Sequence, residues 1–91
     1  MNKLTNPSLL TFESFVKHIK GMIINAGFDF VDINAGEIHR AMGGYPSNNH
    51  RMPICCAAMR SLMGPNDIIL IQPKKGNGAS LTIRYHVSRN R

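Results

Sequence analysis

The chain has 91 residues, of which 43% are hydrophobic, and its eleven Lys or Arg against five Asp or Glu residues give a net charge of +6. This length corresponds to one small domain, which excludes an enzyme with separate catalytic and binding domains. The sequence has no run of 18 or more apolar residues and no signal-peptide pattern near its start. We therefore expect a cytoplasmic protein that does not enter a membrane.

The positive charge is concentrated in the C-terminal part of the chain. Residues 1–37 contain three basic and four acidic residues, a net charge of −1, whereas residues 38–91 contain eight basic residues and one acid, Asp67, a net charge of +7. A segment with this imbalance favours polyanionic partners, such as nucleic acid, over neutral or cationic ones.

The N-terminal third predicts an arm followed by an amphipathic helix. Residues 1–10 show little hydrophobic periodicity and predict a loosely ordered arm. From Thr11, a plausible N-cap, apolar residues recur at helical spacing as far as Gly27, which can adopt the left-handed conformation that ends a helix. This helix, or the arm, is also a plausible surface for a homodimer or for a larger protein partner.

A short strand and a short helix are expected next. Residues 28–33 alternate well enough for a strand, and Asn34 followed three residues later by Glu37 predicts a reciprocal helix cap. The helix should begin near Ala35 and stop at the Gly43-Gly44 pair. Its spacing places the apolar residues on one face, Ile38, Ala41 and Met42, and the polar residues on the other, His39 and Arg40.

A third helix is expected to begin between Asn49 and Pro53 and to end before Gly64-Pro65. At 100° per residue it has an apolar arc and an opposite arc that carries no acid. The apolar arc contains Ile54, Cys55, Ala58, Met59, Leu62 and Met63, and the opposite arc contains Asn49, Pro53, Cys56, Ala57 and Arg60.

The C-terminal third predicts a β-hairpin. Residues 67–72 form a β-branched run of strand length, residues 73–80 are glycine-rich and basic, and residues 81–87 alternate strictly between apolar and polar side chains. The expected organisation is therefore an arm over 1–10, one α+β domain over 11–88 and a basic tail over 89–91.

This order of elements, with three helices and a small antiparallel sheet, resembles the winged helix-turn-helix family of DNA-binding domains over roughly residues 11–88. The resemblance implies that the third helix lies in the major groove of DNA and that the hairpin loop, the wing of that family, touches the phosphate backbone or the minor groove. The turn over residues 43–48 is longer than the family's tight connection, which puts the docking angle of the third helix in doubt.

Candidate DNA contacts fall into two groups. Asn and Arg side chains can form paired hydrogen bonds with adenine and guanine, so the base-reading candidates are Asn49, His50 and Arg60. Cations on neighbouring surfaces would neutralise phosphates, and these candidates are Arg40, Arg51, Lys74, Lys75 and Arg84. Arg51 could instead pair with Asp67 or with a helix carbonyl.

The leading hypothesis is a non-enzymatic module that binds double-stranded DNA without a cofactor or metal ion, as a small regulator or as part of a bacterial or phage-type mobile element. A second hypothesis is a protein-interaction module that binds an acidic protein surface. A third is an HNH-like metal nuclease with His39 as general base, although no carboxylate lies between Glu37 and Asp67 to help to bind the metal.

The two cysteines are adjacent and lack the spacing of a zinc site, so free thiols are expected. We expect Cys55 to be a small buried hydrophobe and Cys56 to lie near the surface. There Arg60, one turn further along the helix, could lower the pKa of the Cys56 thiol and allow redox sensing.

Overall fold

The first helix begins three residues earlier than the sequence analysis predicts. The computed structural model of the protein describes residues 8–47 and 50–87, and helix α1 spans Leu9–Asn25. Ser8 is its N-cap: the Ser8 Oγ accepts a hydrogen bond from the Thr11 backbone N–H, and the Thr11 Oγ1 accepts one from the Ser8 N–H at 2.7 Å. Because this exchange satisfies two otherwise free donors, Thr11 lies inside the helix and is not its cap.

The remaining elements follow the predicted order. They are β1 (Phe30–Asn34), α2 (Ala35–Met42), α3 (Met52–Ser61), β2 (Ile68–Ile71) and β3 (Thr82–His86). Gly27 has the left-handed φ of 91° expected after α1, and Gly43 ends α2 with a φ of 99°. Asn34 caps α2 by accepting a hydrogen bond from the Glu37 N–H at 3.0 Å, which is one half of the reciprocal cap that the spacing predicts.

The strands form one antiparallel sheet in the order β1-β3-β2. The predicted hairpin is confirmed as β2 and β3, and residues 72–81 between these strands are called the hairpin loop below. The long-range pairing is that of β1 with β3, which places Asp32 opposite Arg84 and Ile33 opposite Ile83. Over residues 8–47 and 50–87 the protein is therefore an α+β domain with three helices and a small antiparallel sheet.

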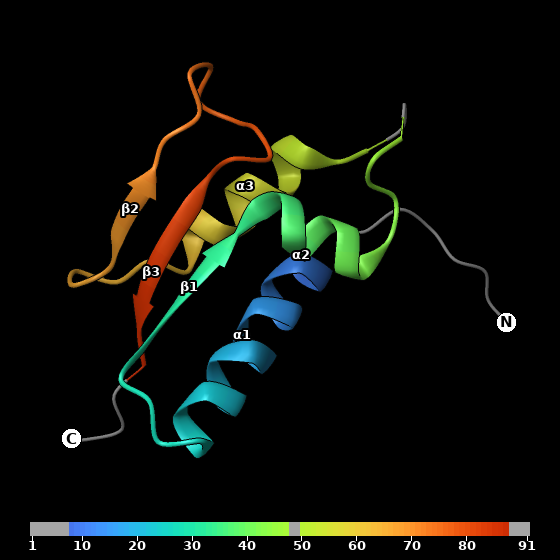
Figure 1. The fold of residues 1–91 in the computed structure, drawn as a ribbon. Coiled ribbons are helices and arrows are strands. Elements are labelled where there is room, and N and C mark those ends of the chain that lie inside the picture. Colours follow the sequence, from blue (N-terminus) through green and yellow to red (C-terminus); the bar gives the residue numbers. More distant parts are fainter. Residues whose placement is uncertain (1–7, 48–49, 88–91) are drawn as a thin grey trace, which may run out of the picture.

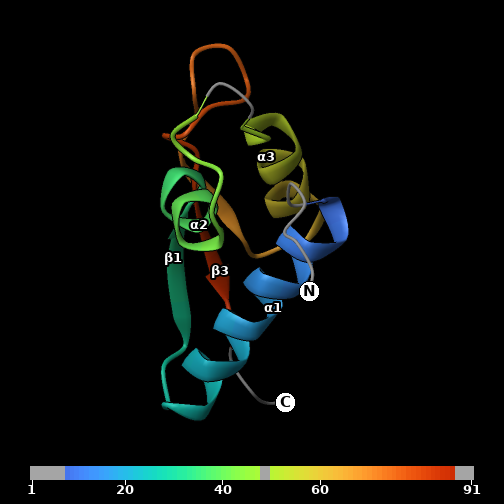
Figure 2. The same ribbon diagram turned by 90° about the vertical axis from the view of Figure 1, so that its right-hand side faces the viewer.

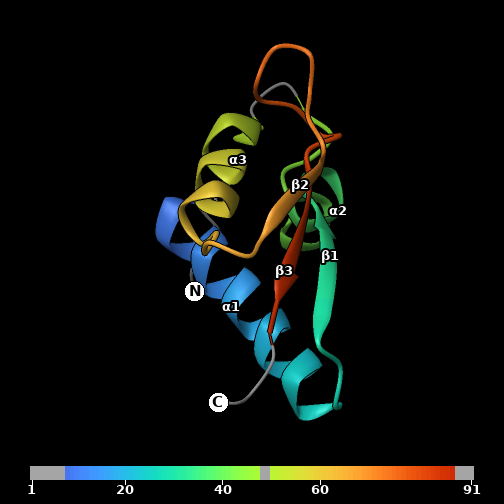
Figure 3. The ribbon, with the colours of Figure 1, turned by 90° about the vertical axis from the view of Figure 1, so that its left-hand side faces the viewer.

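Helices α1 and α3 cover one face of this sheet, and no helix in the described part of the chain covers the other (Figures 2 and 3). The alternation predicted for residues 81–87 is confirmed, because the inward side chains are all buried: Leu81, Ile83, Tyr85 and Val87. Tyr85 also joins the layers, since its hydroxyl donates a hydrogen bond to the Met59 carbonyl of α3 at 2.7 Å. Burial raises the pKa of Tyr85, so this hydroxyl keeps its proton.

The predicted faces of α2 are partly wrong. Ala41 is exposed, whereas His39 is fully buried with its ring edge-on to Phe12 of α1, at 5.1 Å between ring centroids. Both ring nitrogens of His39 have partners: Nδ1 lies 3.1 Å from the Gly43 carbonyl oxygen, and Nε2 accepts a hydrogen bond from the Arg51 N–H at 2.8 Å. A neutral ring protonated at Nδ1 satisfies both contacts, so burial of this polar side chain costs little.

No helix among the described residues is long and apolar enough to cross a bilayer.

Candidate nucleic-acid interface

Three segments with exposed cations meet at one end of the molecule. Figures 1 and 2 place the hairpin loop, the N-terminal end of α3 and the segment that joins α2 to α3 at the same end, away from the α1–β1 turn. We call this end, formed by residues 40–47, 50–53 and 72–81, the basic end. Residues 38–61 and 72–81 contain no Asp or Glu, and the nearest acid in the sequence is Glu37 in the first turn of α2.

Arg40 and His50 both lie close to one aromatic ring at this end, that of Tyr45. The Arg40 guanidinium carbon is 5.4 Å from the centroid of the Tyr45 ring, and the His50 ring centroid is 5.8 Å from it. His50 Nδ1 accepts a hydrogen bond from the Met52 N–H at 3.2 Å, which leaves the Nε2 edge of this exposed residue for other contacts. Tyr45 therefore links the two predicted contacts, a role that the sequence analysis did not assign.

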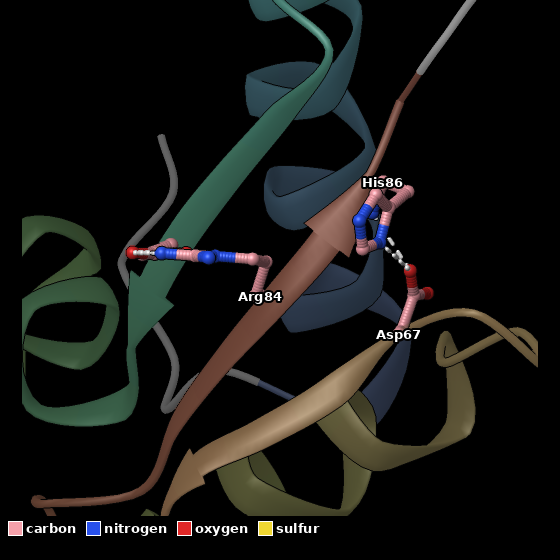
Figure 4. Close-up of polar contacts among 4 residues, drawn as sticks. Asp67, Arg84 and His86 are labelled. Carbon is pink, nitrogen blue, oxygen red and sulfur yellow. Dashed lines mark hydrogen bonds and ion pairs between the residues drawn. The ribbon is translucent and has the colours of Figure 1, made fainter.

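Arg51 immediately precedes α3 and is exposed. Its backbone N–H is held by His39, and this bond fixes the start of α3 against the end of α2. The alternative pairing of Arg51 with Asp67 is wrong. Asp67 instead accepts hydrogen bonds from the Gly64 N–H at 2.8 Å and from the His86 N–H at 2.7 Å, at the opposite end of the hairpin from its loop (Figure 4).

The hairpin loop is fastened to α3 and does not project freely. The Arg60 guanidinium donates to the Asn77 Oδ1 at 2.7 Å and to the Gly76 carbonyl oxygen, and the Cys56 thiol donates to the Gly78 carbonyl at 3.4 Å. Lys74 and Lys75 remain exposed on this loop. The contacts fix the position of both lysines relative to α3.

Arg60 lies beside the hairpin loop that carries Lys74 and Lys75, because its guanidinium bonds residues 76 and 77 of that loop. The same bonds occupy its donors, and the residue is only partly exposed. Base reading by Arg60 would require these bonds to be exchanged for bonds to DNA. In the free protein Arg60 positions the loop.

The expectations for Cys56 are wrong. Cys56 is fully buried beneath the hairpin loop, and its pKa is raised because the loss of solvent outweighs both the Gly78 hydrogen bond and the charge of Arg60. Burial likewise raises the pKa of Cys55 to about 12. Both thiols are free and protonated near neutral pH, which opposes the reactivity that redox sensing needs.

Arg84 lies away from the basic end. It projects from the central strand on the uncovered face of the sheet, and its Nε and Nη2 donate to the two carboxylate oxygens of Asp32 at 2.7 and 3.0 Å (Figure 4). The guanidinium also stacks over Phe30, at 4.2 Å from the ring centroid. The pKa of Asp32 is lowered by these hydrogen bonds. Arg84 therefore has a partner close by in space. Because this partner is 52 residues away in the sequence, local sequence patterns do not predict the pair.

Two further predictions concern this end: Asn49 as a base-reading residue and His39 as the general base of a nuclease. Asn49 lies outside the described residues. His39, the general base of the nuclease hypothesis, is buried with both ring nitrogens occupied, and the described residues contain no group of three or more His, Cys, Asp or Glu that could hold a metal ion.

The solvent-facing side of α3 is short of hydrogen-bond donors. Its exposed residues after the cap are Pro53, Ala57 and Ser61, and the Ser61 hydroxyl donates to a Glu13 carboxylate oxygen at 2.5 Å.

Comparisons with protein-family models, with curated protein sequences and with solved structures give no match. The inference of function therefore rests on the geometry of the basic end.

Proposed function

We propose that the protein is a winged-helix domain that binds double-stranded DNA through its basic end and catalyses no reaction. The observation that carries the proposal is that the three segments of the basic end lack carboxylates and carry exposed cations, namely Arg40 beside Tyr45, Arg51, and the Lys74-Lys75 pair. The element order and the β1-β3-β2 sheet support the fold part of the proposal.

The binding energy would come mainly from phosphate contacts. Each cation that neutralises a phosphate releases condensed counterions, so affinity falls with salt at a logarithmic slope of about −0.9 per contact. Four available cations give a slope of roughly −4. Arg60 and Arg84 are not counted because their donors are bonded within the protein.

Direct base reading would be limited to the N-terminal end of α3. His50 exposes one ring edge there, and Asn49 precedes it in the sequence. Pro53 and Ala57, on the exposed side of the helix, offer no side-chain donor. We therefore expect modest sequence preference, as suits a small regulator or the DNA-targeting part of a larger system.

The test measures affinity for a duplex of random sequence over a series of salt concentrations. Lys74→Ala should reduce the magnitude of the logarithmic slope by about 0.9, the contribution of one phosphate contact. Lys17→Ala is the matched control, because it removes the same charge from an exposed position on α1. Equal effects of the two substitutions would show that net charge alone drives binding, and no association with any duplex in dilute buffer would overturn the proposal.

A protein-interaction module is the second candidate. It is favoured because the exposed side of α3 carries small, uncharged side chains. Pro53 and Ala57 suit a closely packed protein partner better than they suit a base edge. Such a module should not bind duplex DNA at physiological salt. A DNA-binding domain should bind a labelled duplex, and an unlabelled duplex should displace that label by competition.

A further inference from the structure

A small pocket lies at the opposite end of the hairpin from its loop. Its walls come from three parts of the chain: Lys20 of α1, residues 62 and 64–67 at and after the end of α3, and His86 at the end of β3. The pocket has a volume of about 240 Å³, which corresponds to the space of about eight water molecules. It is therefore smaller than the pockets that hold drug-sized ligands, and it suits a molecule of roughly ten non-hydrogen atoms.

The Asp67 carboxylate shapes this pocket but is already used within the protein. Its side chain is only 7% exposed, and its oxygens accept hydrogen bonds from the Gly64 N–H at 2.8 Å and from the His86 N–H at 2.7 Å. Figure 4 shows the carboxylate pointing from the start of β2 toward His86. These bonds join the turn after α3 to the sheet and satisfy the carboxylate.

Lys20 lines the same pocket without an ion-pair partner. Its ammonium nitrogen lies 4.9 Å from the centroid of the Tyr85 ring, whose hydroxyl is bonded to α3. No described residue forms an ion pair or a hydrogen bond with this ammonium group. Because Lys20 is only partly exposed, its three donors have less access to water than those of a lysine on an open surface. A cation in this position favours an anionic ligand.

The rest of the pocket combines polar donors with an apolar wall. The Asn66 side chain lies on its rim, and the His86 ring is 44% exposed, with Nδ1 3.6 Å from the Asp67 Oδ1. Nε2 of His86 has no hydrogen-bond partner among the described residues. Leu62 and Pro65 supply apolar carbon atoms. The pocket therefore offers one unpaired positive charge, further donors and a surface for an apolar group.

We propose that this pocket binds a small monocarboxylate, whose carboxylate contacts Lys20 and whose apolar body lies against Leu62 and Pro65. A monoanion matches the single charge of Lys20. A phosphate dianion would exceed that charge and would be repelled by the nearby Asp67 carboxylate. The site does not depend on the proposed function, because the hairpin loop and its lysines lie at the other end of the hairpin.

Benzoate, a monocarboxylate of this size, is the probe for a test on the full chain by amide NMR spectra. Its addition should cause saturable shifts, with a Kd on the order of 1 mM, in the signals of the pocket wall: Gly64, Asn66, Asp67 and His86. Benzyl alcohol has a similar size and no charge, and it should bind at least about tenfold more weakly. The absence of saturable shifts in these signals would overturn the proposal.

Substitutions on α1 separate the pocket from the general attraction of a basic protein for anions. Lys20→Met keeps a long apolar side chain without the charge and should weaken benzoate binding at least about tenfold, whereas Lys20→Arg should retain binding. Lys17→Met is the matched control, since it removes the same charge from an exposed position on the same helix, and its affinity should stay near that of the wild type. Equal losses in the two methionine variants would show that benzoate follows net charge, and the proposal would be wrong.

Inorganic phosphate, titrated in the same way, tests the class of ligand. It should bind more weakly than benzoate, because it lacks an apolar body and carries more charge than Lys20 balances. Tighter binding of phosphate than of benzoate at the same signals would show that the assignment to a monocarboxylate is wrong.

Discussion

Arg60 has a different role from the one its position on a helical wheel predicts. The wheel places it on the outer arc of α3, where a guanidinium suits base reading, but its donors bond Asn77 and Gly76 of the hairpin loop. These partners lie 16 and 17 residues further along the chain, so only the folded chain reveals them. Because the bonds are charge-assisted, they hold the loop more firmly than neutral hydrogen bonds would.

Arg60→Ala should therefore act through the loop. We expect the free energy of unfolding to fall by about 1.5–2 kcal/mol, the lower part of the range for hydrogen bonds to a charged group, since the site is partly exposed. Affinity should fall to the same extent for duplexes of every sequence. Urea unfolding and binding titrations on several duplexes check this, and a loss confined to one base position would restore Arg60 as a base reader.

The Asp32–Arg84 pair gives a prediction on pH dependence. Because the pKa of Asp32 is lowered from 3.8 in the folded protein, its contribution to stability is present above that value and is lost as the pH falls through the lower, folded pKa. The two side chains are 38% and 34% exposed, so the contribution should be only about 0.2–1 kcal/mol. Asp32→Asn should be less stable than the wild type at neutral pH and should approach it at roughly pH 2, as measured by urea unfolding.

At the scale of elements, α2 and the hairpin loop approach each other closely at Gly36. The Gly36 N–H donates to the Ala79 carbonyl at 3.0 Å, and a Cβ at Gly36 would lie 3.1 Å from both the Cβ and the carbonyl oxygen of Ala79. Helix propensity alone would favour alanine at this position. The observed spacing shows that packing between α2 and the loop favours glycine.

Gly36→Ala should accordingly destabilise the protein by about 1–2 kcal/mol, the typical cost of overpacking a close contact. Gly21→Ala in α1 is the matched control: no atom lies within 4 Å of the added Cβ, so this change should stabilise the protein by about 0.5–1 kcal/mol. Thermal or urea unfolding of both variants measures the difference. Stabilisation of both variants would show that the loop moves away from α2 without cost.

At the scale of the whole molecule, the two cysteines report how firmly the loop, α3 and the core are joined. Cys55 is buried against α2, with its thiol 3.6 Å from the Ala35 carbonyl oxygen, and Cys56 is buried under the hairpin loop. Exposure of Cys56 to solvent requires the loop to leave α3. Because Cys55 is buried against α2, its reaction reports global opening. Because Cys56 is buried under the hairpin loop, its reaction reports local opening of that loop.

Both thiols should react slowly with a thiol-specific reagent at neutral pH, because burial raises their pKa values and excludes the reagent. In Arg60→Ala, the labelling rate of Cys56 should rise while that of Cys55 stays near the wild-type rate. Mass spectrometry after timed labelling distinguishes the two sites. Rapid labelling of Cys56 in the wild type would contradict the fastened loop.

The kinds of element, their order and most of their ends can be predicted from local sequence patterns. Periodicities of two and 3.6 residues, the Asn34 cap and the glycine stops at Gly27 and Gly43 act within a few residues of the chain, so they can be interpreted without a fold. The first cap was misplaced because Ser8 and Thr11 are both good capping residues. Ser8 is favoured because it can exchange hydrogen bonds with Thr11 three residues later.

Which polar groups are available at the basic end depends on contacts between segments that are distant in the sequence. His39 and Cys56 lie on helix faces that a local pattern assigns to solvent, yet the segment after α2 and the hairpin loop cover them. Arg60 and Arg84 find partners 16 to 52 residues away. The physical reason is that burial and pairing depend on which distant segments are brought together. Lys74, Lys75, Arg40 and Arg51 are exposed, and none of them forms an ion pair within the described residues.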